Sequence, residues 1–199
     1  ESGGTSGSTN NTFINFHNNG GTEVSQITVE ETATNEGQMV FKTGGTTTAM
    51  TIDKDGHITK PLQSAFQAAK GSGGQQLNVS NDDTVTFNTE VFDQNGDFAS
   101  NTFTAPVTGK YQLQATVRMD NLVTGVTYFG IGITTSNRSY ADIFVVHTNS
   151  NYLSLKVSAL ADMDANDTAK VVFNQNGGSA HVDLEEDAAR THFSGYLVA

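Results

Sequence analysis

Four oxygen-bearing side chains stand together in one short segment: Asp162, Asp164, Asn166 and Asp167. Their spacing is similar to the start of a calcium loop, in which carboxylate and amide oxygens ligate the cation. The segment has neither the glycine of the sharp turn nor the closing glutamate of such a loop. Asp and Asn also occupy ordinary turns, because their side chains bond nearby backbone groups. Two interpretations stay open, a turn or a metal site, and calcium is the one cofactor that the sequence suggests.

Two other acidic groups allow the same two interpretations. Asp93, Asn95 and Asp97 form the first, and Asp53 with Asp55 forms the second. A calcium site in either would again need oxygen ligands converging from a flexible loop.

The histidines show no metal-binding spacing. No His-x-His or His-Glu-x-x-His pattern occurs. One histidine per chain can still complete a metal site on a three-fold axis, and His17 and His57 are the candidates for such a site. The five histidines are His17, His57, His147, His181 and His192.

Aromatic and polar side chains in or beside predicted loops form a candidate receptor-binding set. Tyrosine with Asn and Ser suits adaptable contact to a glycan or a protein. Each tyrosine fits packing at a sheet edge equally well. The set consists of Tyr128, Arg138, Tyr140, Asn149, Asn151 and Tyr152.

Enzyme motifs are missing, and the sequence predicts no enzyme. Gly-x-Ser-x-Gly does not occur, and Gly130-x-Gly132 lacks the remaining glycines of a phosphate loop. Consecutive carboxylates at 185–187 are predicted to point apart along a solvated edge. A glycosidase would instead need two carboxylates about 5–10 Å apart in a cleft.

The charge balance narrows the partners. Lys and Arg number 10 against 21 Asp and Glu, for a formal net charge of −11. This argues against nucleic acid, whose phosphates demand a basic surface, and against anionic membranes. It is compatible with divalent cations and with uncharged or cationic glycans. No apolar run is long enough for membrane insertion, and the absence of cysteine leaves stability to packing or oligomerisation.

The distribution of apolar residues predicts an all-β chain. Asn, Gly and Thr, which are abundant, are poor helix formers. Period-two alternation marks half-buried strands, and Gly130 and Gly132 within one such strand suggest a close approach by another group. The clearest alternation runs through Tyr111, Leu113, Ala115, Val117 and Met119.

Three regions are predicted. Residues 1–11, rich in Gly, Ser, Thr and Asn, are expected to form a flexible leader. Residues 12–60 contain short strands separated by turns, with an Asp-Gly hairpin signal at 55–56. This β-rich segment has too few apolar side chains to be stable alone, so we expect identical copies to cover its apolar faces. Residues 61–199 form the remaining region.

Two segments carry a family resemblance. Residues 103–111 read Phe-Thr-Ala-Pro-Val-Thr-Gly-Lys-Tyr, and 191–199 read Thr-His-Phe-Ser-Gly-Tyr-Leu-Val-Ala. With the Ala-Phe pair at 65–66 and Asp-Thr-Ala-Lys-Val at 167–171, they resemble the complement C1q globular head, a tumour-necrosis-factor-like jelly roll. Asn166 stands where the family commonly has Gly, and Asn tolerates a positive φ. The calcium site of some C1q heads does not carry over, because 147–152 contain no carboxylate.

The resemblance implies a compact homotrimer that binds rather than catalyses. No collagen repeat precedes the domain. The segment Ile-Asp-Lys-Asp-Gly-His-Ile at 52–58 resembles the β-rich parts of bacteriophage tail fibres and spikes. Together these features suggest an extracellular tail-fibre tip of a virion, bound to other tail proteins and attaching to a host-surface glycan or protein receptor. Two alternatives stay open: a purely structural trimerisation domain of the fibre, and a bacterial surface module of the same fold.

Overall fold

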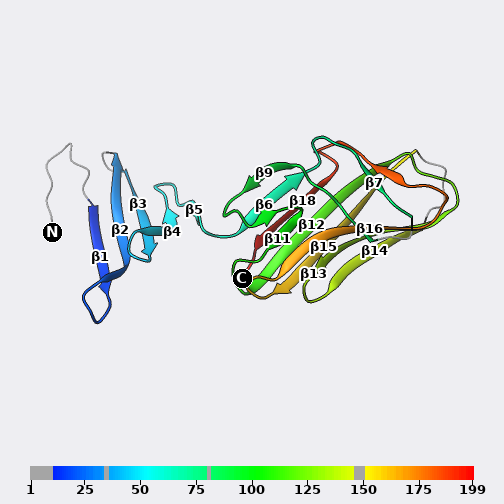
Figure 1. Ribbon diagram of the computed structural model, residues 1–199. Helices are drawn as coiled ribbons and strands as arrows, with labels where there is room; N and C mark the ends of the chain where they lie inside the picture. Colours follow the sequence, from blue (N-terminus) through cyan, green and yellow to red (C-terminus); the bar gives the residue numbers. More distant parts are fainter. Residues whose placement is uncertain (1–10, 34–35, 80–81, 146–150) are drawn as a thin grey trace. The chain divides into compact units, whose positions relative to one another are not determined.

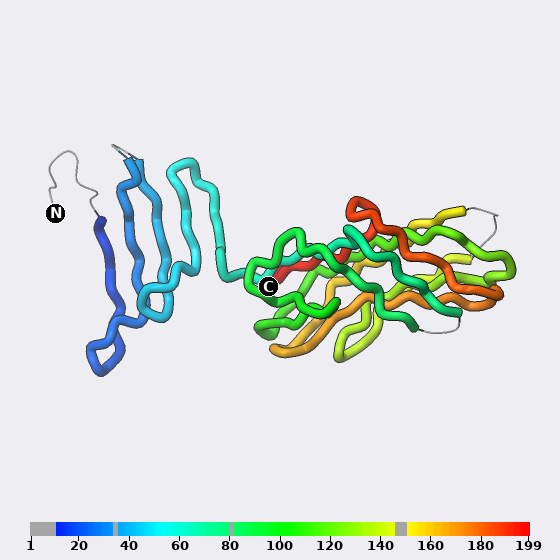
Figure 2. Tube along the Cα trace, turned by 45° about the horizontal axis from the view of Figure 1, so that its top comes forward, coloured from blue at the N-terminus to red at the C-terminus, as the bar shows by residue number. Residues whose placement is uncertain are grey.

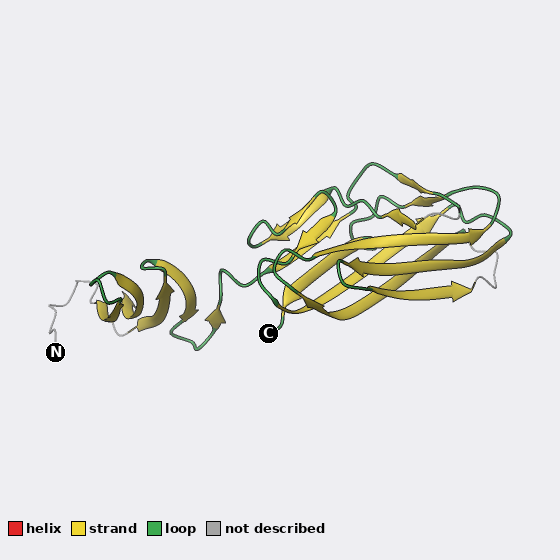
Figure 3. Cartoon of the chain, turned by 60° about the horizontal axis from the view of Figure 1, so that its bottom comes forward, coloured by secondary structure: helices red, strands yellow, loops and turns green. Residues whose placement is uncertain are grey.

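The computed structural model describes residues 11–33, 36–79, 82–145 and 151–199. All helical or extended structure assigned within these ranges consists of β-strands (Figure 3), which confirms the predicted all-β class. Of the predicted leader, only Asn11 is described, and it begins the first strand. None of the described segments forms a helix with the length and hydropathy required to cross a membrane. The chain divides into two compact units, Glu1–Gln63 and Ser64–Ala199.

The first unit is one antiparallel sheet whose strands follow each other in sequence order. They lie side by side in a single layer, in the blue and cyan part of Figures 1 and 2. The predicted Asp-Gly hairpin is confirmed between the last two strands, where Gly56 has φ +86°. The strands are β1 (Asn11–His17), β2 (Glu23–Ala33), β3 (Glu36–Thr43), β4 (Thr47–Ile52) and β5 (Ile58–Thr59).

The pairing register separates this sheet into an apolar and a polar face. Residues paired directly across antiparallel strands share a face, and successive residues alternate between faces. Ile14 pairs with Ile27, which pairs with Phe41, which pairs with Met50. We define the apolar face as Ile14, Phe16, Ile27, Val29, Met39, Phe41, Met50, Ile52 and Ile58.

The opposite face is largely polar and satisfies its own groups. The Gln26 amide donates to the Asn15 side chain at 2.8 Å. Gln38 and Lys42 both donate to the Glu30 carboxylate, at 2.9 and 3.3 Å. The same face also holds Thr28 and Val40, which are buried, and Phe13, which is 56% exposed.

Nothing in the described part of the first unit covers the apolar face. Ile14 and Ile58 are each 59% exposed. Among the described residues of this unit, only Thr28 and Val40 are buried. A single sheet gains stability only when one of its faces is packed against another layer, and this sheet lacks such a layer.

The second unit is a sandwich of two antiparallel sheets. The seven-stranded sheet contains β6 (Ala65–Ala69), β7 (Gln75–Leu77), β9 (Thr89–Asp93), β12 (Gly109–Asp120), β15 (Tyr152–Met163), β17 (Val182–Leu184) and β18 (His192–Leu197). The six-stranded sheet contains β8 (Asp82–Thr84), β10 (Phe98–Ala99), β11 (Thr102–Thr104), β13 (Val126–Thr135), β14 (Ser139–Val145) and β16 (Thr168–Gly177).

One core fills the space between the two sheets. The predicted alternation on β12 is confirmed, since Tyr111, Leu113 and Val117 are fully buried while their sequence neighbours face outward. Phe129 and Ile133 contribute from the other sheet. The predicted strand at 65–69 is also confirmed as β6, with Phe66 and Ala68 in the core.

The segments that carry the family resemblance meet in this core. Phe66 stacks on Phe103 with centroids 4.8 Å apart and meets Phe193 edge-on at 5.0 Å. Gly195 makes this packing possible, because a Cβ there would lie 2.5 Å from Leu113 Cδ2 and 2.8 Å from Phe66 Cε1. A larger residue at 195 would overpack the cluster.

Turns between the segments are tied by specific bonds. The Tyr111 hydroxyl, whose pKa is raised by burial, donates to the Val107 carbonyl at 2.7 Å. Asn166 adopts φ +73°, as predicted for its place in the family pattern, and its N–H donates to Ala105. The turn before β12 and the turn before β16 are thus linked.

Candidate functional site

The outward face of the seven-stranded sheet carries an apolar patch. Leu160 and Tyr196 flank Gln112 on three adjacent strands. Together with Phe92 they are 57, 52 and 48% exposed. Tyr196 and Phe92 line a groove of about 380 Å³ whose floor includes Gly195. We call Phe92, Leu160 and Tyr196 the sheet patch.

A second apolar patch lies on the other sheet. β14 is hydrogen-bonded only to β13, which makes it an edge strand among the described elements. Its last residues, Ile143, Phe144 and Val145, are 60, 45 and 49% exposed. Long exposed apolar edges favour pairing with another chain. Ile143 and Val145 share one face of β14, and Phe144 lies on the other. We call these three residues at the strand edge the edge patch.

An ionic cluster occupies the end of β12. The Arg118 Nε and Nη2 atoms donate to both oxygens of Asp120, at 3.1 and 3.3 Å. The guanidinium carbon lies 5.3 Å from the centroid of the Tyr152 ring, a cation–π geometry. Arg118 also lies 3.5 Å from Asp187. Sequence reasoning missed this cluster, because Tyr152 and Asp187 are far from Arg118 along the chain.

The carboxylates at 185–187 belong to this end of the sheet. A hydrogen bond with Asp120 raises the pKa of Glu185, whereas the bond from Arg190 lowers the pKa of Asp187. Glu186 accepts from the Gly74 N–H at 2.6 Å. Each carboxylate of the predicted solvated edge therefore has a partner within the domain, and Glu186 is exposed.

The predicted receptor-binding residues do not form one surface. Tyr128 lies near the start of β13 and pairs with Val145. Tyr152 is the first residue of β15 and pairs with Asp120. Arg138 and Tyr140 lie at the opposite end, at the turn into β14, where Tyr140 packs against the core. Asn151 is exposed beside Tyr152. Asn149 lies outside the described residues.

Tyr128 lines a shallow groove on the six-stranded sheet. The groove measures about 230 Å³ and includes Gly130, Gly132 and Val172. A Cβ at Gly132 would lie 3.3 Å from Ala141 Cβ and from Val172 Cγ2. The predicted close approach is confirmed at Gly132, whereas a Cβ at Gly130 would lie no nearer than 3.6 Å to another group.

The predicted calcium loop joins β15 to β16, and internal bonds engage its carboxylates. Asp162 pairs with Lys110, which lowers its pKa. One Asp167 oxygen accepts from the Asn137 amide at 2.7 Å and from the Asp164 N–H at 2.8 Å. These bonds are those of a turn, and calcium binding by Asp162, Asp164, Asn166 and Asp167 stays a prediction.

The two other acidic groups also make turn bonds. Asp93 accepts from the N–H groups of Asp97 and Phe98, at 3.0 and 2.8 Å. Asp53 accepts from the N–H groups of Asp55 and His57, at 2.9 and 2.8 Å.

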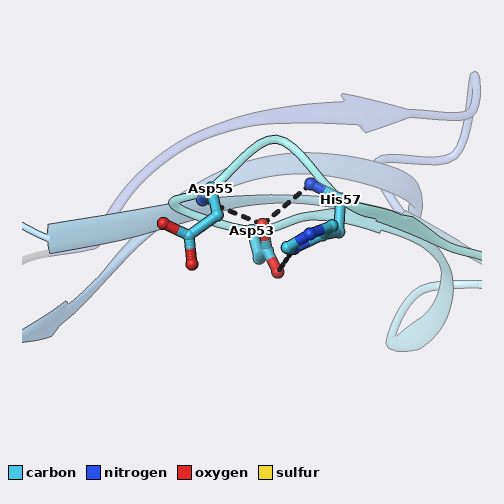
Figure 4. Close-up of side chains that lie close together, drawn as sticks. All are labelled: Asp53, Asp55 and His57. Carbon is cyan, nitrogen blue, oxygen red and sulfur yellow. Dashed lines mark hydrogen bonds and ion pairs between the residues drawn. The ribbon is translucent and has the colours of Figure 1, made fainter.

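The Asp53 turn also brings three potential ligand groups together (Figure 4). Atoms of Asp53, Asp55 and His57 lie within 4.8 Å of one another. The His57 ring bonds Asp53 at 2.8 Å and lowers the pKa of that carboxyl. Because these bonds account for the geometry of a tight exposed turn, the grouping is explained without a metal.

A comparison with protein families matches residues 65–198 to the model described as the C1q domain. The match covers more than half of the chain and includes both segments that meet in the core. The chain belongs to the C1q domain family. The predicted resemblance is thereby confirmed, as is the jelly-roll fold of the second unit.

The C1q domain is also similar to solved structures. The globular domain of zebrafish complement 1qA is 21% identical over 69% of this chain and 98% of its own, with a TM-score of 0.45. Crystal structures of murine APRIL at pH 5.0 and pH 8.5 are 12 and 15% identical over 68% of this chain and 99% of theirs, with TM-scores of 0.49 and 0.48. No curated protein matches the chain.

C1q domains are in general non-catalytic binding modules. Within this one, the features that distinguish the described surface are two exposed apolar patches and a set of shallow grooves. Exposed apolar patches and shallow grooves of this kind suit contact with other macromolecules, including further copies of the chain.

Proposed function

We propose that this protein is a homotrimeric attachment module, the receptor-binding tip of a virion tail fibre that acts outside the cell. The observation that carries the assembly is the uncovered apolar face of the β1–β5 sheet. Specific interfaces bury roughly 800 Å² on each partner, and the apolar face supplies nine apolar side chains from five strands to such an interface. Copies of the same sheet are the occupants that this proposal assigns to it.

The C1q domain supports assembly through its two patches. The sheet patch and the edge patch lie on different sheets. A contact between the sheet patch of one copy and the edge patch of the next is therefore heterologous. Such contacts form a closed ring when the rotation between copies closes. C1q domains form homotrimers, which supports three copies in this proposal.

The virion location rests on the chain order. The fibre-like pattern at 52–58 directly precedes the C1q domain, and no collagen repeat stands between them. The partners in this proposal are two further copies, neighbouring tail proteins and a host-surface receptor.

The mechanism of attachment is multivalency. Three equal sites on one rigid tip raise the effective concentration of the second and third contacts, and avidity gains reach about 10²–10⁴-fold. Weak single contacts to a surface glycan or protein then suffice for stable attachment. Catalysis has no part in this mechanism.

Breaking the ring tests both assembly and function. Ile143→Glu places a carboxylate in the edge patch, where a copy would bury it. We expect a monomeric C1q domain and binding to host cells weakened about 100-fold or more by loss of avidity. Light scattering and a cell-binding assay measure the two effects. Ser139→Glu is the matched control, because it adds the same charge to an exposed position on the same strand.

The outcomes separate the proposal from its structural alternative. A wild-type trimer that binds no host cell would identify a trimerisation domain only and would overturn the attachment role. Because the β1–β5 sheets can hold the copies together on their own, Ile143→Glu is also combined with Ile14→Asp on the apolar face. A double variant that stays trimeric would overturn the ring assigned to the two patches.

A further inference from the structure

Two basic side chains, Lys156 and His192, lie in one row across the outward face of the seven-stranded sheet. Lys156 on β15 pairs with Thr116 on β12, which pairs with His192 on β18. Paired residues share a face, so the two cationic groups flank the Thr116 hydroxyl. They line a groove of about 660 Å³ with Arg190, Gln114 and Ser158. His192 begins β18 and Tyr196 lies near its end, so this groove and the sheet patch occupy opposite ends of that strand.

The charge of this groove is opposite to that of the protein. The chain has a net charge of −11, yet the groove is lined by Lys156, Arg190 and His192 and by no carboxylate. Arg190 is paired with Asp187. Among the described residues, Lys156 has no hydrogen bond or ion pair. Burial, and to a lesser extent the charge of Lys156, lowers the pKa of the half-buried His192. Lys156 therefore lacks a counter-charge, and protonation of His192 would add a second positive charge beside it.

We propose that this groove binds an oxyanion: a carboxylate, sulfate or phosphate group. An ammonium, an imidazolium and hydroxyl groups supply several donors around one point, which suits the multiple acceptors of an oxyanion. Charge-assisted bonds to Lys156 and His192 supply the counter-charge that the row lacks. If the proposed attachment function holds, the oxyanions belong to acidic groups of a surface polysaccharide. The net charge alone favours uncharged or cationic glycans instead.

The first test uses inorganic sulfate and the full chain. Calorimetric titration at low millimolar sulfate, against sodium chloride of equal ionic strength, should give saturable binding. Lys156→Gln should weaken it about tenfold or more, the loss expected for one charged hydrogen bond. Lys170→Gln is the matched control, because Lys170 is exposed on the six-stranded sheet. Absence of saturable binding, or equal losses in the two variants, would overturn the inference.

The second test uses pH. The charged groups that face His192 are Lys156 and Arg190, whereas its neighbours on β12 and β6 are Thr116 and Ala69. A bound anion favours the protonated ring, so sulfate affinity should rise as the pH falls from 8 to 5.5. His192→Gln should remove most of this rise. A rise of the same size in that variant would contradict the role of His192.

The last test separates the sources and the two proposals. An acidic polysaccharide should bind the wild-type chain more tightly than free sulfate, whereas its carboxyl-reduced form should not bind. Binding of sulfate alone would identify an ion site and overturn the glycan assignment. A monomer that binds sulfate through Lys156 would support the oxyanion groove and overturn the proposed trimer. A trimer that binds no sulfate would support the trimer and overturn the groove.

Discussion

Removal of residues 193–199 is expected to abolish soluble folding. β18 lies between β12 and β6, so the deletion separates two strands at the centre of the seven-stranded sheet. It also removes Phe193, which is fully buried against Phe66. Loss of one large core side chain alone costs about 3–5 kcal/mol, and the lost backbone pairing adds to this.

Expression in the soluble fraction and circular dichroism measure this effect. Ser194→Thr is the control, because it changes a partly exposed side chain of the same strand outside the sheet patch and keeps the backbone pairing. A truncated chain that stays soluble with the β signature of the full chain would show that β18 does not hold the sandwich together.

A charge on the apolar face of the first sheet is expected to destabilise that sheet strongly. Ile14 is 59% exposed in one copy, so Ile14→Asp would be tolerated if the face met only water. Covered by another copy, the carboxylate would be buried without a partner, at a cost of about 3 kcal/mol or more per chain. Hydrogen exchange of the β1–β5 amides should accelerate about 100-fold, while that of the C1q domain stays unchanged.

Asn15→Asp is the matched control. Asn15 neighbours Ile14 on β1 but faces the polar side, and its side-chain oxygen accepts from Gln26, a bond that a carboxylate also accepts. Equal exchange in the two variants would mean that the apolar face meets only solvent.

Local patterns predicted most of the strands correctly. Period-two alternation identified β12 and its buried set, and the Asp-Gly pair identified the β4–β5 turn. The close packing at Gly132 and the positive φ of Asn166 were also read from residue type and position. These features depend on a residue and its near neighbours in sequence, which is why they could be predicted.

The surface sites depend on pairing between distant segments. Lys156 and His192 share a row only because β15 and β18 both pair with β12. Arg118 reaches Asp187 by the same route, across 69 residues of sequence. Conversely, Tyr128 and Tyr140 lie near in sequence but at opposite ends of one strand pair. Spacing along the chain does not encode such arrangements.

Mass in solution is the most direct test of the central claim, that three copies share the apolar surfaces that one copy exposes. Light scattering on the purified chain should give about three times 21.1 kDa, or 63.3 kDa, at micromolar concentration. A folded species of 21.1 kDa under those conditions would contradict the account of both units.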